Sequence, residues 1–456
     1  MTTAAGEPWR ADGRFSEFGI AGYELDETTN TARLRYRLDH DEWFEEVLEF
    51  GGAPVGPDAL EGLHRALRVL HLAAGVSYWK LAAPARIVVE TGELSPAERK
   101  FVHDLYDKGM REFAYESSLP LPVRIDIEAH RRAGAPGPLA TAPFASAPPR
   151  AVAVPIGGGK DSIVALEALR DAGIFEQLPV SLLAVNPRPA MARTADIAGL
   201  PLVAIGRRLS PRLAELNAAG ALNGHVPITA LVSLVAVAAG FVHGFDTVLM
   251  ALERSADEAT TVLDGVAVNH QWSKSTECES ELRTVIGESV SSGVVYTSVL
   301  RGVGELEIAR WFAGLDRYHQ AFRSCNKAFR TDGELDGWCG QCAKCRFVFL
   351  MLAPFLDEER LVAIFGHNLL ADATSAGGFR DLFVAGRKPF ECVGERRESL
   401  LALRLISESP SWSNSAVVRS LRADVERDSA DVAMELRPPD QARALVAGAI
   451  DRALSR

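Results

Sequence analysis

The hydrophobic pattern of the chain is clearest in its middle third, where short apolar runs alternate with amphipathic stretches. The runs cover residues 151–156, 180–186, 201–207, 246–253 and 294–300. Runs of this length without polar alternation are typical of strands buried on both faces, and the segments between them have helical spacing. Together they predict an α/β fold, in which helices cover both faces of a parallel sheet.

The first third of the chain has a mixed pattern. Residues 22–39 alternate between apolar and polar positions around polar turn residues at Thr28–Asn30, which predicts a hairpin. Residues 58–80 have helical spacing, and residues 85–90 are apolar enough for a strand. We therefore expect an α+β domain over residues 1–130, and we assign substrate recognition to it.

A second helix of this region has a clear start signal. Residues 95–116 have helical spacing, and Ser95 precedes Pro96, a residue favoured at the first helical position. Glu98 follows the serine by three residues, so the pair predicts a capping box.

Two further segments divide the rest of the chain. Residues 131–149 are rich in Pro and Ala and lack periodicity, so we expect a linker. Residues 150–320 then form the α/β domain, and residues 321–456 are mostly helical and contain a cysteine cluster. The longest apolar run, residues 228–242, is shorter than the ~20 residues that cross a bilayer, so it predicts a buried helix and no membrane insertion.

Composition narrows the class of protein. The chain has 456 residues, 47% hydrophobic and 24% charged, which is typical of a globular protein with two or three domains. A formal charge of -11 argues against nucleic acid as the main partner. The first residues lack the pattern of a secretory signal, so we expect a cytoplasmic protein whose six cysteines are thiols or metal ligands.

A glycine loop follows the first strand of the α/β domain and opens its first helix. It consists of Gly157, Gly158, Gly159, Lys160, Asp161 and Ser162. Glycines let the backbone approach a ligand closely, and a helix N-terminus attracts anions, so the loop predicts a phosphate site. It lacks the Walker A and dinucleotide spacings. The alternative is a tight turn without a ligand.

Four cysteines near the C-terminal region have the spacing of a metal site. Cys325, Cys339, Cys342 and Cys345 form C-x13-C-x2-C-x2-C, and Gly340 permits a tight turn between two of them. Four thiolates at short spacings match a structural zinc ion with a filled coordination sphere. Redox cysteines and chance clustering are the alternatives.

Polar residues at the ends of later strands are candidates for substrate binding. They are Glu253, Arg254, Asn269, Ser273 and Lys274. Ligand contacts in α/β folds lie at the carboxyl ends of strands, and these groups suit a phosphorylated substrate. A solvated loop is the alternative for residues 269–274, a stretch that also contains His270.

Two residues are candidates for acid–base chemistry. His225 lies just before a helix start at Pro227, where it acts either on a ligand or as an ordinary residue of the cap region. Cys392 lies among Pro, Gly and charged residues, a poor setting for simple core filling. His367 is a third candidate by chemistry alone.

The glycine loop resembles the S-G-G-x-D-S pyrophosphate loop of the N-type ATP pyrophosphatases, or PP-loop enzymes. That resemblance implies a Rossmann-like adenine nucleotide alpha hydrolase (HUP) fold, and enzymes that transfer AMP from ATP to a substrate oxygen. It implies ATP and Mg²⁺ as cofactors, with Lys160 supplying charge and Asp161 helping to hold Mg²⁺. Asn186 follows the second strand, where this fold places adenine and ribose. Gly157 stands where these enzymes have the first serine of the loop, so a hydroxyl contact to the pyrophosphate is in doubt.

Seven stretches, in one order along the chain, resemble the MurL family of UDP-N-acetylmuramoyl-L-alanyl-L-glutamate epimerases. They are PIGGGKDSIVALEAL, VNPRP, NGHVPITA, VNHQWSKS, FRSCNKAF, WCGQCAKCRFVFLMLAPF and KPFECVGE. The resemblance implies that ATP and Mg²⁺ drive inversion of the terminal L-glutamate of UDP-MurNAc-L-Ala-L-Glu, giving AMP and pyrophosphate.

The reaction that this family implies leaves some roles open. Adenylation removes the negative charge beside the α carbon, so a base can take the α proton and an acid can return one on the opposite face. Lys160 and Asp161 are then candidates for adenylation, and Cys392 and His225 for proton transfer. The alternatives are an adenylating amide ligase, a nucleotide-binding regulator, and an enzyme similar to 7-cyano-7-deazaguanine synthase. That synthase also has a four-cysteine zinc site.

Overall fold

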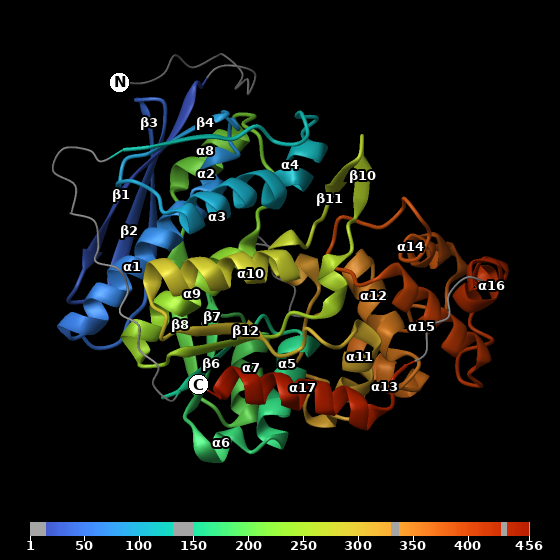
Figure 1. Cartoon of the computed structure of the whole chain (residues 1–456). Coiled ribbons are helices and arrows are strands. Elements are labelled where there is room, and N and C mark those ends of the chain that lie inside the picture. Colours follow the sequence, from blue (N-terminus) through green and yellow to red (C-terminus); the bar gives the residue numbers. More distant parts are fainter. Residues whose placement is uncertain (1–14, 131–148, 330–336, 430–435, 456) are drawn as a thin grey trace.

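One sheet of ten strands runs through the molecule in the order β12-β9-β6-β7-β8-β3-β2-β1-β4-β5. The computed structural model describes residues 15–130, 149–329, 337–429 and 436–455. Helices pack on both faces of the sheet, and the C-terminal helices, orange to red in Figure 1, form a group beside its parallel half.

The parallel half of the sheet confirms the predicted α/β arrangement. Its strands are β6 (Val152–Pro155), β7 (Val180–Val185), β8 (Leu202–Arg208), β9 (Thr247–Met250) and β12 (Val295–Ser298). All neighbouring pairs among them are parallel. If these five strands are numbered 1 to 5 in chain order, they lie side by side in the order 3-2-1-4-5, from β8 to β12. This is a doubly wound order, in which the direction of winding reverses between β6 and β9.

Successive side chains along a strand of this half point alternately into two hydrophobic cores, one on each face of the sheet. Val152 and Val154 contribute to the core on one face, and Ala153 contributes to the core on the other. Successive side chains of a strand point to opposite faces, so a strand covered on both sides must be apolar at every position. The continuous apolar runs of the sequence follow from this double burial.

The other half of the sheet comes from the first 130 residues. Its strands are β1 (Glu17–Asp26), β2 (Thr31–Leu38), β3 (Glu42–Glu49), β4 (Arg86–Val89) and β5 (Asp126–Ala129). The antiparallel pairing of β1 with β2 confirms the predicted hairpin, and β4 confirms the predicted strand. The strands β3 and β5 lie outside the predicted elements.

The two halves meet at the pair β3–β8, which is antiparallel. Across this seam the buried carboxylate of Glu46 accepts a hydrogen bond from Arg207 Nε at 2.7 Å. The segments before and after the predicted linker therefore share one continuous sheet. Residues 131–148 of that linker lie outside the part of the chain that the structure describes.

One face of the sheet is covered by helices from the first half of the chain and its middle. They are α1 (Pro57–Ala74), α2 (Val76–Trp79), α3 (Pro96–Asp107), α4 (Arg111–Glu116), α8 (Pro211–Ala218), α9 (Ile228–His243) and α10 (Thr276–Val285). The α3 N-terminus has the predicted capping box: Glu98 N donates to Ser95 Oγ at 3.1 Å, and Ser95 N donates to Glu98 Oε2 at 2.9 Å.

The helix α9 confirms the prediction for the longest apolar run. Its residues from Ala230 to Gly240 are largely buried in the core on this face. Among the described residues, no helix combines the length and the apolar composition that a membrane span needs. The apolar character of α9 reflects burial against α1 and the sheet.

The remaining helices pack in the core on the opposite face, some of them against the sheet and the others within the C-terminal group beside it. They are α5 (Lys160–Asp171), α6 (Ile174–Gln177), α7 (Pro189–Ala198), α11 (Glu305–Ala313), α12 (Ala343–Leu352), α13 (Glu358–Phe365), α14 (Ala376–Arg380), α15 (Arg396–Glu408), α16 (Ala416–Ser429) and α17 (Pro439–Leu454). The described part of the C-terminal region thus contains helices without a strand, as the sequence predicts. A short hairpin of β10 (Thr261–Leu263) and β11 (Val266–Val268) stands apart from the main sheet (Figure 1).

Candidate active site

The glycine loop connects β6 to α5 beside the point where the winding of the sheet reverses. Gly158 has φ +80°, a left-handed conformation that favours glycine. Gly159 is the N-cap of α5, and because glycine has no side chain, the cap residue provides no side-chain hydrogen bond to the first turn. A Cβ built on Gly157 would meet no described heavy atom within 4 Å, so the loop has space there. The backbone N–H groups of this turn suit an anion.

Lys160 lies beneath the loop and is 2% exposed. Its Nζ donates to Asp161 Oδ1 at 2.5 Å and also to a carboxylate oxygen of Glu305, the first residue of α11. Ser162 Oγ donates to the carbonyl oxygen of Gly159 at 3.1 Å. The lysine charge is therefore held between two carboxylates, and it fixes the start of α5 against the start of α11.

Acidic groups are in excess on this side of the loop. Glu253 follows β9, and its pKa is raised to about 8 by burial and by the nearby charges of Glu305 and Asp161. Burial also acts to raise the pKa of Asp161, but Lys160 and Lys344 outweigh it and hold the pKa below its usual value. Mg²⁺ binds through one or two carboxylates together with phosphate oxygens, so this donor set fits the ion.

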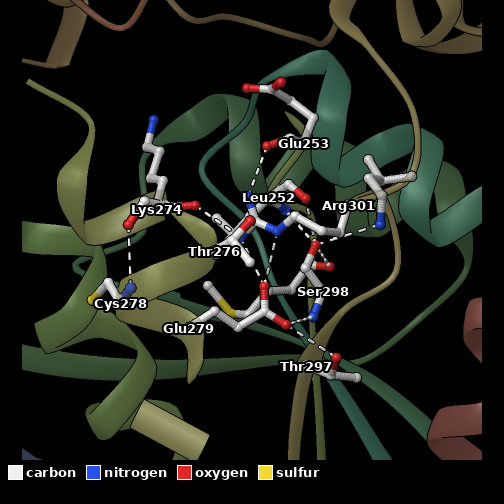
Figure 2. Close-up of polar contacts among 12 residues, drawn as sticks. Leu252, Glu253, Lys274, Thr276, Cys278, Glu279, Thr297, Ser298 and Arg301 are labelled. Atoms are coloured by element: carbon white, nitrogen blue, oxygen red, sulfur yellow. Dashed lines mark hydrogen bonds and ion pairs between the residues drawn. The ribbon is translucent and has the colours of Figure 1, made fainter. Parts of the chain in front are cut away.

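Arg301 fixes two of the predicted substrate-binding residues through their backbones. It donates from Nη1 to the carbonyl oxygen of Glu253 and from Nη2 to that of Lys274, each at 2.8 Å. Its guanidinium also pairs with Glu279 at 2.7 Å. Glu279 in turn accepts from Ser298 N at the end of β12 at 2.9 Å, in the network drawn in Figure 2. This network sets Glu253 and Lys274 relative to the ends of β9 and β12.

A half-buried group of titratable side chains surrounds Cys392. Its Sγ accepts a hydrogen bond from Lys274 Nζ at 3.2 Å and lies 3.5 Å from His270 Nε2. His270 Nδ1 lies 2.5 Å from Glu112 Oε2 on α4. The His225 ring lies 4.4 Å from that of His270, and its Nδ1 is 3.8 Å from Glu112 Oε2. The structure therefore brings together Cys392, His225 and Lys274, which the sequence proposes separately.

The charges of this group favour a thiolate. Burial alone would raise the pKa of the Cys392 thiol, but Lys274, His270 and Lys344 outweigh it and hold that pKa well below its usual value. Burial lowers the pKa of His270, yet its contacts with Cys392 and Glu112 raise it to about 9. Burial and the charge of His270 lower the pKa of His225 to about 3. These shifts favour the thiolate form of Cys392 and the imidazolium form of His270, while His225 favours the neutral imidazole.

The segment that carries Cys392 is tied to elements on both sides. Gln271 Nε2 donates to the carbonyl oxygen of Val393 at 2.9 Å. Lys344 N donates to Glu391 Oε2 at 2.7 Å, and its Nζ donates to the carbonyl oxygen of Cys392. These contacts hold the thiol in place between α12 and the 270–274 stretch.

Two lysines connect the thiol to the glycine loop. Lys274 and Lys344 both act electrostatically on Cys392 and on Asp161. Such effects weaken steeply with distance, so the sulfur and the loop aspartate belong to one charged region. The glycine loop and the thiol are therefore parts of the same candidate active site.

Several predicted site residues make other contacts. Arg254 Nε pairs with Glu395 at 3.1 Å and lines a polar hollow away from the thiol. Asn269 bonds the backbone of Ala256 and Gln271. Asn186 bonds the backbone of Arg207 through both its amide atoms, each at 2.8 Å. Ser273 is buried in the turn that precedes α10. His367 lies against Gly340 rather than beside the thiol.

Three residues of the site are not singled out by the sequence. Glu112, Glu305 and Lys344 are all buried, and each contacts a residue at least 45 positions away along the chain. Each is an ordinary charged residue of a helix by local pattern. A buried charged residue needs a partner, but burial of a particular charge is visible only in the tertiary structure.

The four predicted zinc ligands converge on one point. The Sγ atoms of Cys325, Cys339, Cys342 and Cys345 all lie within 4.8 Å of one another. The distances are 3.7 Å between Cys339 and Cys345 and 3.4 Å between Cys342 and Cys345. A tetrahedral zinc ion with Zn–S bonds of about 2.3 Å separates its sulfurs by about 3.8 Å, so the donor set fits zinc. Gly340 between two of them has φ +68°.

We expect Cys342→Ser to lower the zinc content of the purified protein and its melting temperature. Cys342 is also the N-cap of α12 and accepts from Cys345 N at 3.4 Å, so the site holds the start of a helix of the core. A structural zinc ion supplies folding free energy. Metal analysis and thermal unfolding of the variant measure both effects.

The matched control for that variant is Cys278→Ser. Cys278 is fully buried in the other core, away from the cysteine cluster. The zinc content of the Cys278→Ser variant should equal that of the unmodified protein. An unchanged zinc content in Cys342→Ser, or no zinc in either protein, would contradict the zinc site.

Glu112, His225 and His270 also have ligand atoms within 4.8 Å of one another. The His270–Glu112 contact of 2.5 Å is a hydrogen-bond distance, and the other ring nitrogen of His270, Nε2, lies 3.5 Å from Cys392 Sγ. A protonated imidazole cannot bind a metal ion. We therefore read this group as a hydrogen-bonded chain.

Comparison with known proteins covers almost the whole chain. The family model of the MurL N-terminal domain matches residues 10–299, and that of the MurL C-terminal domain matches residues 321–435. A UDP-N-acetyl-alpha-D-muramoyl-L-alanyl-L-glutamate epimerase of Salinispora tropica is 43% identical over 90% of this chain and 88% of its own length. Proteins with the same name from Micromonospora sp. and Xanthomonas oryzae pv. oryzae are 42% and 40% identical, over 90% and 91% of this chain and 90% of each relative.

Proposed function

The chain belongs to the MurL family of UDP-N-acetyl-alpha-D-muramoyl-L-alanyl-L-glutamate epimerases, and from that premise we propose an ATP-dependent route for its reaction. The enzyme is an isomerase that converts the terminal L-glutamate of UDP-MurNAc-L-Ala-L-Glu to D-glutamate, in the synthesis of peptidoglycan precursors. ATP is a second substrate. It transfers AMP to the α-carboxylate of the glutamate and releases pyrophosphate.

Adenylation is needed because the α proton beside a carboxylate is very weakly acidic. Removal of that proton would place a carbanion next to a negative charge. The acyl-adenylate lacks the carboxylate charge and its carbonyl accepts electrons more readily, so the α proton becomes more acidic. Each pKa unit gained corresponds to about 1.4 kcal/mol.

The glycine loop is proposed to bind the pyrophosphate part of ATP, as in the PP-loop enzymes of the HUP fold. The supporting observations are its place at the reversal of the sheet, the left-handed Gly158, and the open N-terminus of α5. Asp161, with Glu253 and Glu305 nearby, would hold Mg²⁺, which neutralises phosphate charge. Lys160 keeps Asp161 and Glu305 in place between the two helix starts.

Cys392 is proposed to act on the substrate after adenylation. The single observation that carries the proposal is the Cys392 thiol, which contacts Lys274 and His270 and shares the charges of Lys274 and Lys344 with Asp161 of the loop. A phosphate site alone would serve any adenylating enzyme. A stabilised thiolate in the same charged region suits further chemistry on the activated acyl group.

The direct test is incubation of the purified protein with UDP-MurNAc-L-Ala-L-Glu, ATP and Mg²⁺. We expect one AMP for each turnover and D-glutamate on chiral analysis of the hydrolysed product. An amide ligase would instead require ammonia or an amine and would give a nitrogenated product. Epimerisation that proceeds at full rate without ATP would refute the adenylation route.

A further inference from the structure

The side chains of Cys392, His270 and Glu112 form a hydrogen-bonded chain in the order thiol, imidazole, carboxylate. His270 faces the sulfur with Nε2, at 3.5 Å, and the carboxylate with Nδ1, at 2.5 Å. Because each ring nitrogen has its own partner, Glu112 fixes the orientation of the ring. This is the arrangement by which an imidazole activates a nucleophile and a third group orients the imidazole.

We propose that Cys392 is a nucleophile that takes the glutamyl group from the acyl-adenylate as a thioester. This inference rests on the proposed function. The thiolate sulfur forms a bond to the α-carbonyl carbon, the bond from that carbon to the AMP oxygen breaks, and AMP leaves with the electron pair. While the carbonyl is bound to sulfur, a base takes the α proton as the C–H bond breaks, and an acid returns a proton to the opposite face of the α carbon.

Hydrolysis completes the cycle. The oxygen of a water molecule bonds to the carbonyl carbon, the carbon–sulfur bond breaks, and the sulfur leaves as thiolate. Both protons of the water are released as the carboxylate and the thiolate form. The step needs no oxidant, reductant or further reactant.

The electrostatics of the site favour a nucleophile over a general base at this position. Lys274 Nζ at 3.2 Å and the His270 imidazolium stabilise the thiolate, and its pKa lies well below the usual value. A weaker base removes an α proton less readily, because the proton-transfer equilibrium becomes about tenfold less favourable for each pKa unit. A thiolate of low pKa is still a competent nucleophile toward an activated acyl group.

The position of the thiol also suits acyl transfer. The segment of Cys392 is held by Lys344 and Gln271, and Lys274 acts on both the sulfur and Asp161 of the loop. An acyl-adenylate made at the loop would thus form within the same charged region as the sulfur. The thioester would keep the α proton acidic after AMP has left, because sulfur donates electrons to the carbonyl less than oxygen does.

The test compares two isotope exchanges in the presence of UDP-MurNAc-L-Ala-L-Glu and Mg²⁺. Exchange of labelled pyrophosphate into ATP reports reversal of adenylation. Exchange of labelled AMP into ATP, with pyrophosphate present, requires two steps. Free labelled AMP must first attack an acyl group that has been transferred from the adenylate, which re-forms the acyl-adenylate. Pyrophosphate then converts that adenylate to labelled ATP. We expect both exchanges in the unmodified enzyme. Neither exchange requires the thioester to accumulate.

Variants assign the second exchange to the triad. Cys392→Ala should lose AMP exchange and keep pyrophosphate exchange. Glu112→Gln removes the carboxylate that orients His270 and raises its pKa, so it should lower AMP exchange by about 10²-fold with much less effect on pyrophosphate exchange. Cys278→Ala removes a thiol of the core, and should keep both exchanges.

The outcomes separate the two proposals. Pyrophosphate exchange without AMP exchange in the unmodified enzyme would overturn the thioester and leave adenylation standing, with Cys392 as a proton carrier. AMP exchange that survives in Cys392→Ala would overturn the role of this cysteine. Absence of both exchanges in an enzyme that epimerises would overturn the adenylation route and the thioester with it.

Discussion

Cys392→Ser is expected to abolish epimerisation while ATP is still converted to AMP. The glycine loop and its carboxylates do not include Cys392, so the adenylate should form and then hydrolyse slowly without inversion. A serine hydroxyl is far less acidic than a thiol, so Lys274 and His270 cannot hold it as an anion. We expect epimerisation to fall by at least about 10²-fold.

Deuterium exchange provides the second measurement for this variant. In D₂O the unmodified enzyme should place deuterium at the α carbon of the terminal glutamate, and Cys392→Ser should lose most of this exchange. Cys278→Ser is the control for loss of a thiol elsewhere, because Cys278 is buried in the core. If Cys392→Ser exchanges and epimerises normally, the thiol is only a packing residue, and His225 becomes the better candidate.

Asp161→Asn is expected to lower AMP formation by about 10²–10³-fold, the usual cost of removing one electrostatic contact from a reacting phosphate or oxyanion. Asparagine keeps an oxygen that can accept from Lys160 Nζ, so the start of α5 should remain folded. It removes the negative charge that is proposed to hold Mg²⁺. AMP release and a thermal unfolding curve of the same preparation measure the two effects.

The matched control is Asp171→Asn at the other end of α5. Asp171 is about half exposed and pairs with Arg443 at 2.9 Å. Exposed ion pairs contribute little to stability, and this one is remote from the loop, so activity and melting temperature should change little. Full AMP formation in Asp161→Asn would contradict the proposed nucleotide site.

Local pattern was sufficient for many elements of the fold. The run at 228–242 is apolar except for Thr229 and Ser233 and became α9, and the Ser95–Glu98 pair forms the predicted capping box. The strand β3 was less visible because Glu46 lies within it. That carboxylate is buried and paired with Arg207 of β8, about 160 residues later, so only the partner strand explains a charge at that position.

The candidate site also contains some residues that the sequence indicates and others that only the structure identifies. The loop at 157–162 is one contiguous segment, and three of the four clustered cysteines, Cys339, Cys342 and Cys345, are closely spaced, so both features are visible in the local sequence. The sequence also singled out Cys392 and His225, but without a geometric relation between them. Their shared neighbour Glu112 comes from α4 and shows no local signal.

The sequence by itself therefore determined the parallel sheet with its covering helices, the glycine loop after the first strand of its parallel half, and the cysteine set suited to zinc. Each depends on residues close together along the chain, whose spacing reflects local geometry. Only the tertiary structure decided that β3 joins β8 in one sheet and that Cys392, His270 and Glu112 form a chain of contacts. The pKa values of those groups depend on burial and on charges brought from distant segments, and neither is written in local sequence.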